Sequence, residues 1–200
     1  MIAVQISEIA RDFIVAIATI VTALVAAFGL RTWLHEAKWK QNREIARTLV
    51  RGVLKVRDAF QNARNPFLPA SEFPLDYDTF NDGTDNKYKG EMHVYQKRAE
   101  ILGVALTELE SAVLEAEVFW GVKVHELFVE VRKCCIRWQT GVEMHLKDIY
   151  TNYTYLSTNQ SLKEKIELDI SPFDEKDDLS IRIKKAFDEL IKFTQPFLGA

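Results

Sequence analysis

The longest apolar run of the sequence lies near its beginning. Residues Phe13–Leu30 read FIVAIATIVTALVAAFGL, eighteen residues without a charge. A helix of that length spans roughly 27 Å, close to the hydrocarbon thickness of a bilayer. Its apolar side chains occupy every face, whereas a helix on a protein surface carries one apolar stripe. The run therefore predicts a single transmembrane helix, with residues 1–35 as N-terminal segment and anchor and residues 36–200 as a separate domain.

Two other interpretations of this run stay open, a helix buried in a soluble core and a cleaved signal peptide. A core helix is usually shorter and apolar on one side only. A signal peptide begins with a basic segment, but residues 1–12 contain Glu8, Arg11 and Asp12 and no lysine. The transmembrane interpretation fits the pattern best.

Basic residues flank the run unequally, which predicts its orientation. Only Arg11 precedes it, and five basic residues follow: Arg31, Lys38, Lys40, Arg43 and Arg47. Because positive residues stay on the cytoplasmic side, we expect the N-terminus outside and the body in the cytoplasm. Within the run, Thr19, Ala23 and Ala27 recur every four residues, a spacing of small side chains that lets membrane helices approach closely. These three form a candidate helix-association face.

The body shows helical periodicity throughout. Residues 36–63 carry an apolar stripe (Ile45, Leu49, Val53, Val56, Phe60) and a basic row at four-residue spacing (Arg43, Arg47, Arg51, Lys55). The basic row can face anionic lipid, an acidic partner surface or solvent. A second helix ends at Gly121 and carries a heptad seam, as in coiled coils: Met92, Tyr95, Ala99, Leu102, Leu106, Leu109, Val113 and Ala116. The seam is either an intramolecular core or a subunit interface.

The remaining elements complete an all-α fold. Residues 65–86 are a loop rich in Pro, Asp and Asn, a third helix runs from about Lys123 to Tyr155, and residues 157–178 are a polar connection. A short last helix starts near Leu179 and is expected to end at Pro196. One transmembrane helix followed by an antiparallel bundle of three long helices and one short C-terminal helix buries every apolar stripe.

Charge and cysteine content narrow the function. Residues 1–64 carry a net charge of +5 and residues 65–200 one of −8. The acidic body lacks the clustered lysine and arginine that nucleic-acid binding requires. The two cysteines, Cys134 and Cys135, are adjacent, so no disulfide framework is expected and a reducing compartment fits. They are interpreted as buried helical residues, with a reactive vicinal dithiol as the alternative.

No motif with recognisable chemistry occurs. The Glu-x-x-His pairs of di-iron bundles are missing, His125-Glu126 lacks the second histidine of a zinc motif, and no phosphate-binding glycine loop is present. The sequence therefore predicts no cofactor, no metal and no catalytic residue. An enzyme would need carboxylates that converge from a distance, and Glu108, Glu115, Glu117 and His125 are the candidates.

Several stretches together resemble a family of bacterial proteins with an N-terminal anchor, a helical cytoplasmic body and no assigned activity. They are Leu49-Val50-Arg51-Gly52-Val53-Leu54-Lys55-Val56-Arg57-Asp58-Ala59-Phe60, Arg64-Asn65-Pro66-Phe67, Leu109-Glu110, Glu115-Ala116-Glu117 with Trp120-Gly121, and Ile191-Lys192-Phe193-Thr194-Gln195-Pro196-Phe197. The resemblance implies a bacterial inner-membrane location and a helical fold, and it carries over no site residue.

The sequence thus leads to three functional hypotheses. The first is a membrane-anchored, non-enzymatic interaction or scaffold protein that self-associates or binds a hetero-partner. The second is a membrane-tethered sensor or a stress or defence effector whose bundle binds a ligand or partner. An enzyme of unknown reaction is the third.

Overall fold

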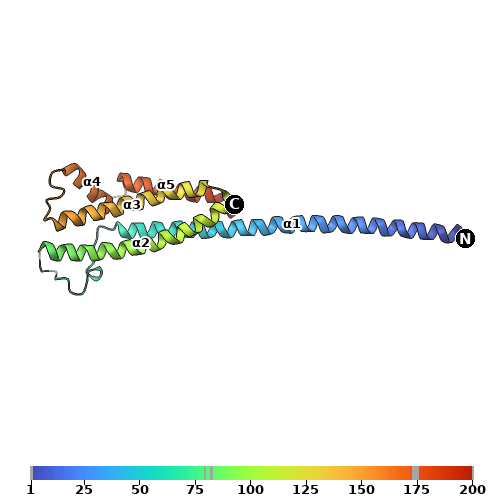
Figure 1. Cartoon of the computed structure of the whole chain (residues 1–200), viewed down its shortest axis with the longest axis horizontal. Coiled ribbons are helices and arrows are strands. Elements are labelled where there is room, and N and C mark those ends of the chain that lie inside the picture. Colours follow the sequence, from blue (N-terminus) through green and yellow to red (C-terminus); the bar gives the residue numbers. More distant parts are fainter. Residues whose placement is uncertain (1, 79, 82, 173–175, 200) are drawn as a thin grey trace. The chain divides into compact units, whose positions relative to one another are not determined.

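The computed structural model describes the backbone of residues 2–78, 80–81, 83–172 and 176–199, and within these the side chains from Thr19 onward. Over these residues the chain is all-helical: five α-helices, one short 3-10 turn (η1, Ala70–Glu72) and no strand. Helix α1 comprises Ile2–Ala63. It is followed by α2 (Thr84–Trp120), α3 (Lys123–Tyr150), α4 (Gln160–Ile170) and α5 (Asp178–Leu198) (Figure 1). The all-α fold class is confirmed.

The chain divides into two compact units, Met1–Glu44 and Ile45–Ala200, and α1 contributes to both. In the first unit every residue from Thr19 to Gln41 is exposed, including the large apolar side chains of Val25 and Phe28, each 67% exposed. No helix in the part of the chain with described side chains contains an apolar stretch long enough to cross a membrane. Phe13–Ala18, the first third of the run identified in the sequence, lie outside that part.

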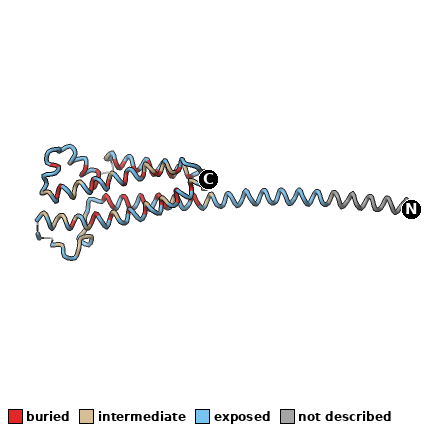
Figure 2. Tube along the Cα trace, in the orientation of Figure 1, coloured by how far each residue is buried: buried red, intermediate tan, exposed pale blue. Residues whose placement is uncertain are grey.

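The second unit, called the body below, has a continuous apolar core. Helices α2 and α3 pack along one another, and α4 and α5 both pack on α3. Buried residues line the inner faces of the helices (Figure 2). The core takes in the whole apolar stripe of α1 together with Phe128, Trp138 and Phe187. This arrangement is consistent with the expected helical bundle.

The heptad seam of α2 lies mainly within this core. Tyr95, Leu102, Leu109, Val113 and Ala116 are buried, Ala99 and Leu106 pack against the core partly buried, and Met92 is exposed. Close packing against α1 depends on Gly52, where an added methyl group would lie 3.3 Å from Leu109 Cα. The seam therefore serves intramolecular packing.

The third helix ends five residues earlier than expected. The backbone of Asn152 and Tyr153 has positive φ angles of 54° and 61°, and the N–H of Tyr153 donates to the carbonyl of Asp148. The buried Asp148 carboxylate accepts from the N–H of Leu156, so it fixes the turn that follows α3. Polar turn chemistry of this kind competes with the helix, and residues 151–155 are Thr, Asn and Tyr, which have only modest helix propensity.

The connection after α3 contains a helix, α4, that the sequence analysis did not predict. Asn159 caps it by accepting from the N–H of Leu162, and Ile166 and Ile170 bury its short apolar face. The last helix also runs past Pro196 to Leu198. A proline in the final turn removes one backbone donor there, which costs a helix much less than a proline at its centre.

Candidate functional site

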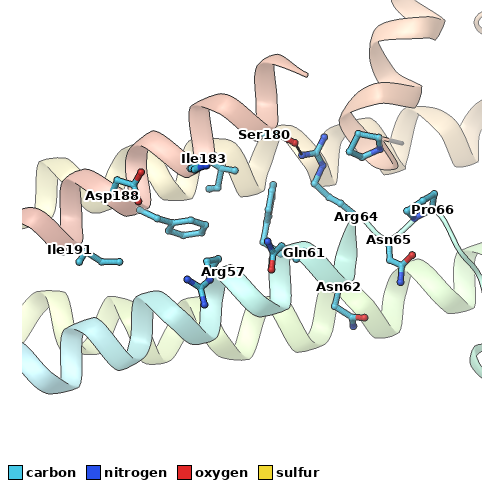
Figure 3. A pocket seen from close by; sticks show the side chains of 14 residues that line it. Arg57, Gln61, Asn62, Arg64, Asn65, Pro66, Ser180, Ile183, Asp188 and Ile191 are labelled. Atoms are coloured by element: carbon cyan, nitrogen blue, oxygen red, sulfur yellow. Dashed lines mark hydrogen bonds between the residues drawn. The ribbon is translucent and has the colours of Figure 1, made fainter. Parts of the chain in front are cut away.

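A groove of about 900 Å³ lies between the last turns of α1 in the body and α5. Side chains of α1 and α5 line its two walls (Figure 3). Phe60 and Phe187 form an apolar floor, 3% and 4% exposed. Arg57, Gln61, Lys184 and Asp188 form a polar rim. An apolar floor with a few polar groups is typical of a binding groove.

Arg64, directly after α1, closes the inner end of the groove. Its guanidinium is buried, 5% exposed, and donates four hydrogen bonds, to the carbonyls of Leu168 and Asp169, to Ser180 Oγ and to Asp177 Oδ1, at 2.7–2.9 Å. The two carbonyls belong to the last turn of α4, where a helix leaves its carbonyls without internal partners. Arg64 thus connects the end of α1 to the end of α4 and the start of α5.

A second arginine completes this polar cluster. Arg137 of α3 binds both carboxylate oxygens of Asp169, at 2.8 and 2.7 Å, and also pairs with Asp178. The hydrogen bonds with Asp169 raise the pKa of Arg137 further above its usual value. Asp169 therefore binds Arg137 of α3 through its side chain and Arg64 through its carbonyl. These contacts connect the end of α1 with α3, α4 and α5.

The start of α5 depends on Asp177. Its carboxylate accepts from the N–H of Ser180, from the Ser180 hydroxyl and from Arg64. Burial raises the pKa of Asp177, but these hydrogen bonds outweigh burial and hold the pKa below its usual value. The Ser180 hydroxyl is consequently occupied by a carboxylate and a guanidinium, with no histidine beside it to act as a base.

A second buried arginine, Arg98 of α2, fixes the loop after α1. It is 2% exposed and donates to the carbonyls of Asn65 and Phe67 and to the carboxylate of Glu72, at 2.7–2.8 Å. Arg64 and Arg98 satisfy helix-end and loop carbonyls of the body, and Arg137 pairs with the carboxylates of Asp169 and Asp178. Their donors are engaged within the protein, so they stabilise the groove and its surroundings.

The predicted basic row does not form one surface feature. Arg43 belongs to the first unit and lies half-buried, with its guanidinium 5.2 Å from the centroid of Trp39. Arg47 and Arg51 are exposed, and Lys55 pairs with Glu108 of α2 at 2.5 Å. Thr19, Ala23 and Ala27, the predicted helix-association face, are all exposed in the first unit. Whether either set binds anything stays a prediction.

The four candidate groups for chemistry do not converge on one site. Glu108 pairs with Lys55, Glu117 lies 3.1 Å from His125 Nδ1, and Glu115 is exposed. Among the side chains described, no three His, Cys, Asp or Glu residues are placed to hold a metal ion. The structure does not bring the four residues into one pocket.

The two cysteines are free and buried in α3. Burial raises the pKa of Cys134, and it raises the pKa of Cys135 to about 12. Because the thiolate is the reactive form, both thiols are expected to react slowly at neutral pH.

The groove and the arginine cluster were not found from the sequence, because their members come from four separate helices. Comparison with protein-family models, with curated proteins and with solved structures gave no match.

Proposed function

We propose that the protein is a membrane-anchored, non-enzymatic interaction protein that self-associates through its N-terminal helix. The observation that carries the proposal is the exposed stretch from Thr19 to Leu34. It contains eight large apolar side chains, each more than half exposed: Ile20, Val21, Leu24, Val25, Phe28, Leu30, Trp33 and Leu34. Surfaces of this kind mark a contact with lipid or protein. Together with Phe13–Ala18 this stretch has the length of one transmembrane helix, which would anchor the antiparallel bundle of the body.

The proposed location is the bacterial inner membrane, with the N-terminus outside and the body in the cytoplasm. The excess of lysine and arginine after the apolar run supports this orientation. Protease added to inverted inner-membrane vesicles should then digest the body, while protease added to intact spheroplasts should leave it whole. The reverse pattern would contradict the orientation.

A role without catalysis is supported by how the polar groups of the body are used. Arg64, Arg98 and Arg137 are committed to carbonyls and carboxylates of the fold, and the Ser180 hydroxyl is paired with Asp177. The groove rim offers Arg57, Gln61, Lys184 and Asp188 without an adjacent nucleophile and base. Such a surface suits binding better than bond cleavage.

Self-association is tested by the mass of the full chain in mild detergent. We expect a defined oligomer, and Ala23→Leu should weaken it because a larger side chain on the association face separates the helices. Val21→Leu, on the opposite face of α1, is the matched control and should leave the mass unchanged. A monomeric unmodified chain would contradict self-association and favour a hetero-partner.

The groove favours a second candidate function, a membrane-tethered sensor or effector that binds a ligand or partner through its body. Its volume, about 900 Å³, is within the range of small-molecule sites. Phe187→Trp would fill part of the floor, so the affinity of the body for its ligand or partner should fall while the mass of the oligomer stays the same.

A further inference from the structure

The turn between α2 and α3, here called the apolar turn, consists of Val118, Phe119, Trp120, Gly121 and Val122. It exposes large apolar side chains: Val118 is 81%, Val122 60% and Phe119 42% exposed. Turns that face water usually carry Gly, Asn, Asp, Ser or Pro. Among these five residues only Gly121, with a φ of +80°, belongs to that class. The composition indicates a surface that is covered in the working protein.

Aromatic packing on α5 holds the apolar turn in place. The indole of Trp120 stacks on the ring of Phe197 in the last turn of α5, with centroids 4.1 Å apart and planes 9° from parallel. Phe193 contacts the same indole edge-on. Because Trp120 packs on Phe193 and Phe197, the backbone of the turn is fixed. The exposure of Val118, Phe119 and Val122 is therefore a property of the fold.

The five residues of the turn carry no charge of their own. Of the charged side chains that flank it, Lys123 pairs with Glu126 at 3.0 Å, and Glu117 lies 3.1 Å from His125. The turn therefore offers an apolar surface. A contact made by such a surface draws on burial of apolar area and responds weakly to salt.

The turn lies at the end of the body where the chain enters from the anchor. Gly52 packs on Leu109, Lys55 pairs with Glu108, and Arg98 binds the carbonyl of Asn65, so α1 and α2 run antiparallel. Continuing this register places Ile45, the first residue of the body, beside the last turn of α2. Figure 1 shows the α2–α3 turn and the C-terminal end of the chain at that same end of the body.

We propose that the apolar turn inserts into the headgroup region of the membrane that holds the anchor. Residues 31–44 connect Leu30 to Ile45 and span roughly 21 Å as a helix, so the tether keeps this end of the body near the bilayer. Valine, phenylalanine and tryptophan suit the boundary between headgroups and acyl chains. This inference rests on the proposed anchor.

The test places one fluorescent label at a time on the full-length protein in nanodiscs that contain lipids with a nitroxide near the headgroup. Val122→Cys carries the label in the turn. Ile181→Cys is the matched control, because Ile181 is 59% exposed on α5, whereas Val122 is 60% exposed. Leu24→Cys reports on the anchor, and the unsubstituted protein measures the slow background from Cys134 and Cys135.

We expect quenching at Leu24 and at Val122 that is severalfold stronger than at Ile181, equally in zwitterionic and anionic lipid. Quenching at Leu24 with Val122 no stronger than Ile181 would overturn the contact and leave the anchor standing. A Val122 label that is shielded from water but not quenched would mean that a second copy or another protein covers the turn, and it would also overturn the contact. No quenching at Leu24 would refute the anchor and the contact together.

Discussion

Replacing Arg64 with methionine should destabilise the body more than any surface substitution. Methionine keeps much of the side-chain volume but removes four hydrogen bonds and the positive charge. The Asp177 carboxylate, 4% exposed, would then be buried without its cation. Removing one partner of a buried ion pair costs about 3–5 kcal/mol, and we expect Arg64→Met to lie in this range.

Two further variants separate the ion pair from general damage to the helix. Arg57 lies on α1, seven residues before Arg64, and pairs with its neighbour Asp58, with both side chains about half or more exposed, so Arg57→Met should cost less than about 0.5 kcal/mol. In the double variant Arg64→Met/Asp177→Asn the uncompensated carboxylate is gone. We therefore expect the double variant to be more stable than Arg64→Met alone.

The assay is urea unfolding of the full-length protein at a fixed concentration of mild detergent, followed by circular dichroism. The free energy of unfolding of each variant is compared at equal slope, so that a change in midpoint reports stability. A cost for Arg64→Met no larger than that for Arg57→Met would refute the reasoning. A double variant less stable than Arg64→Met would show that Asp177 contributes mainly as a cap.

Three other predictions follow from packing and from titration. Gly52→Ala should cost about 1–3 kcal/mol because its methyl group meets the backbone of α2, whereas Gly103→Ala, with open space around it, should gain about 0.5–1 kcal/mol in the same urea assay. Cys134 and Cys135 should react with a thiol reagent slowly in the folded protein and fast in urea; fast labelling of the folded protein would contradict their burial. Folding lowers the pKa of Asp177, so the carboxylate's contribution to the free energy of unfolding is present above the unfolded pKa of 3.8 and is lost as the pH falls through the folded pKa. Asp177→Asn should therefore lose stability less steeply than the unmodified protein below about pH 4. Parallel curves of stability against pH for the two proteins would refute this.

Apolar periodicity was enough to predict the helical class and the inward faces of the long helices. The stripe from Ile45 to Phe60 and the seam from Tyr95 to Ala116 are buried because side chains three and four residues apart share one face. Helix ends were harder, because they depend on capping contacts. The early end of α3 rests on Asp148 binding Leu156, eight residues away, and no periodicity signals it.

The groove and its arginine cluster could not be derived from the sequence. Arg64 and its partner Asp177 are 113 residues apart, and Arg137 and Asp169 are 32 apart. A charged residue near a helix end looks the same in the sequence whether it is solvated or buried. The helix α4 was missed for a related reason, since its eleven residues interleave four apolar positions with five charged ones.

Alkaline extraction of membranes tests the central claim, that residues 13–30 anchor the protein in the bilayer, most directly. Membranes from cells that make the full-length protein are washed with carbonate at high pH, and the protein is measured in pellet and supernatant. The unmodified chain should stay in the pellet, and Val21→Arg/Val25→Arg should release it, because an arginine at the centre of a membrane helix costs about 2.5–3.5 kcal/mol. Release of the unmodified chain, or retention of the double-arginine variant to the same extent, would contradict the anchor.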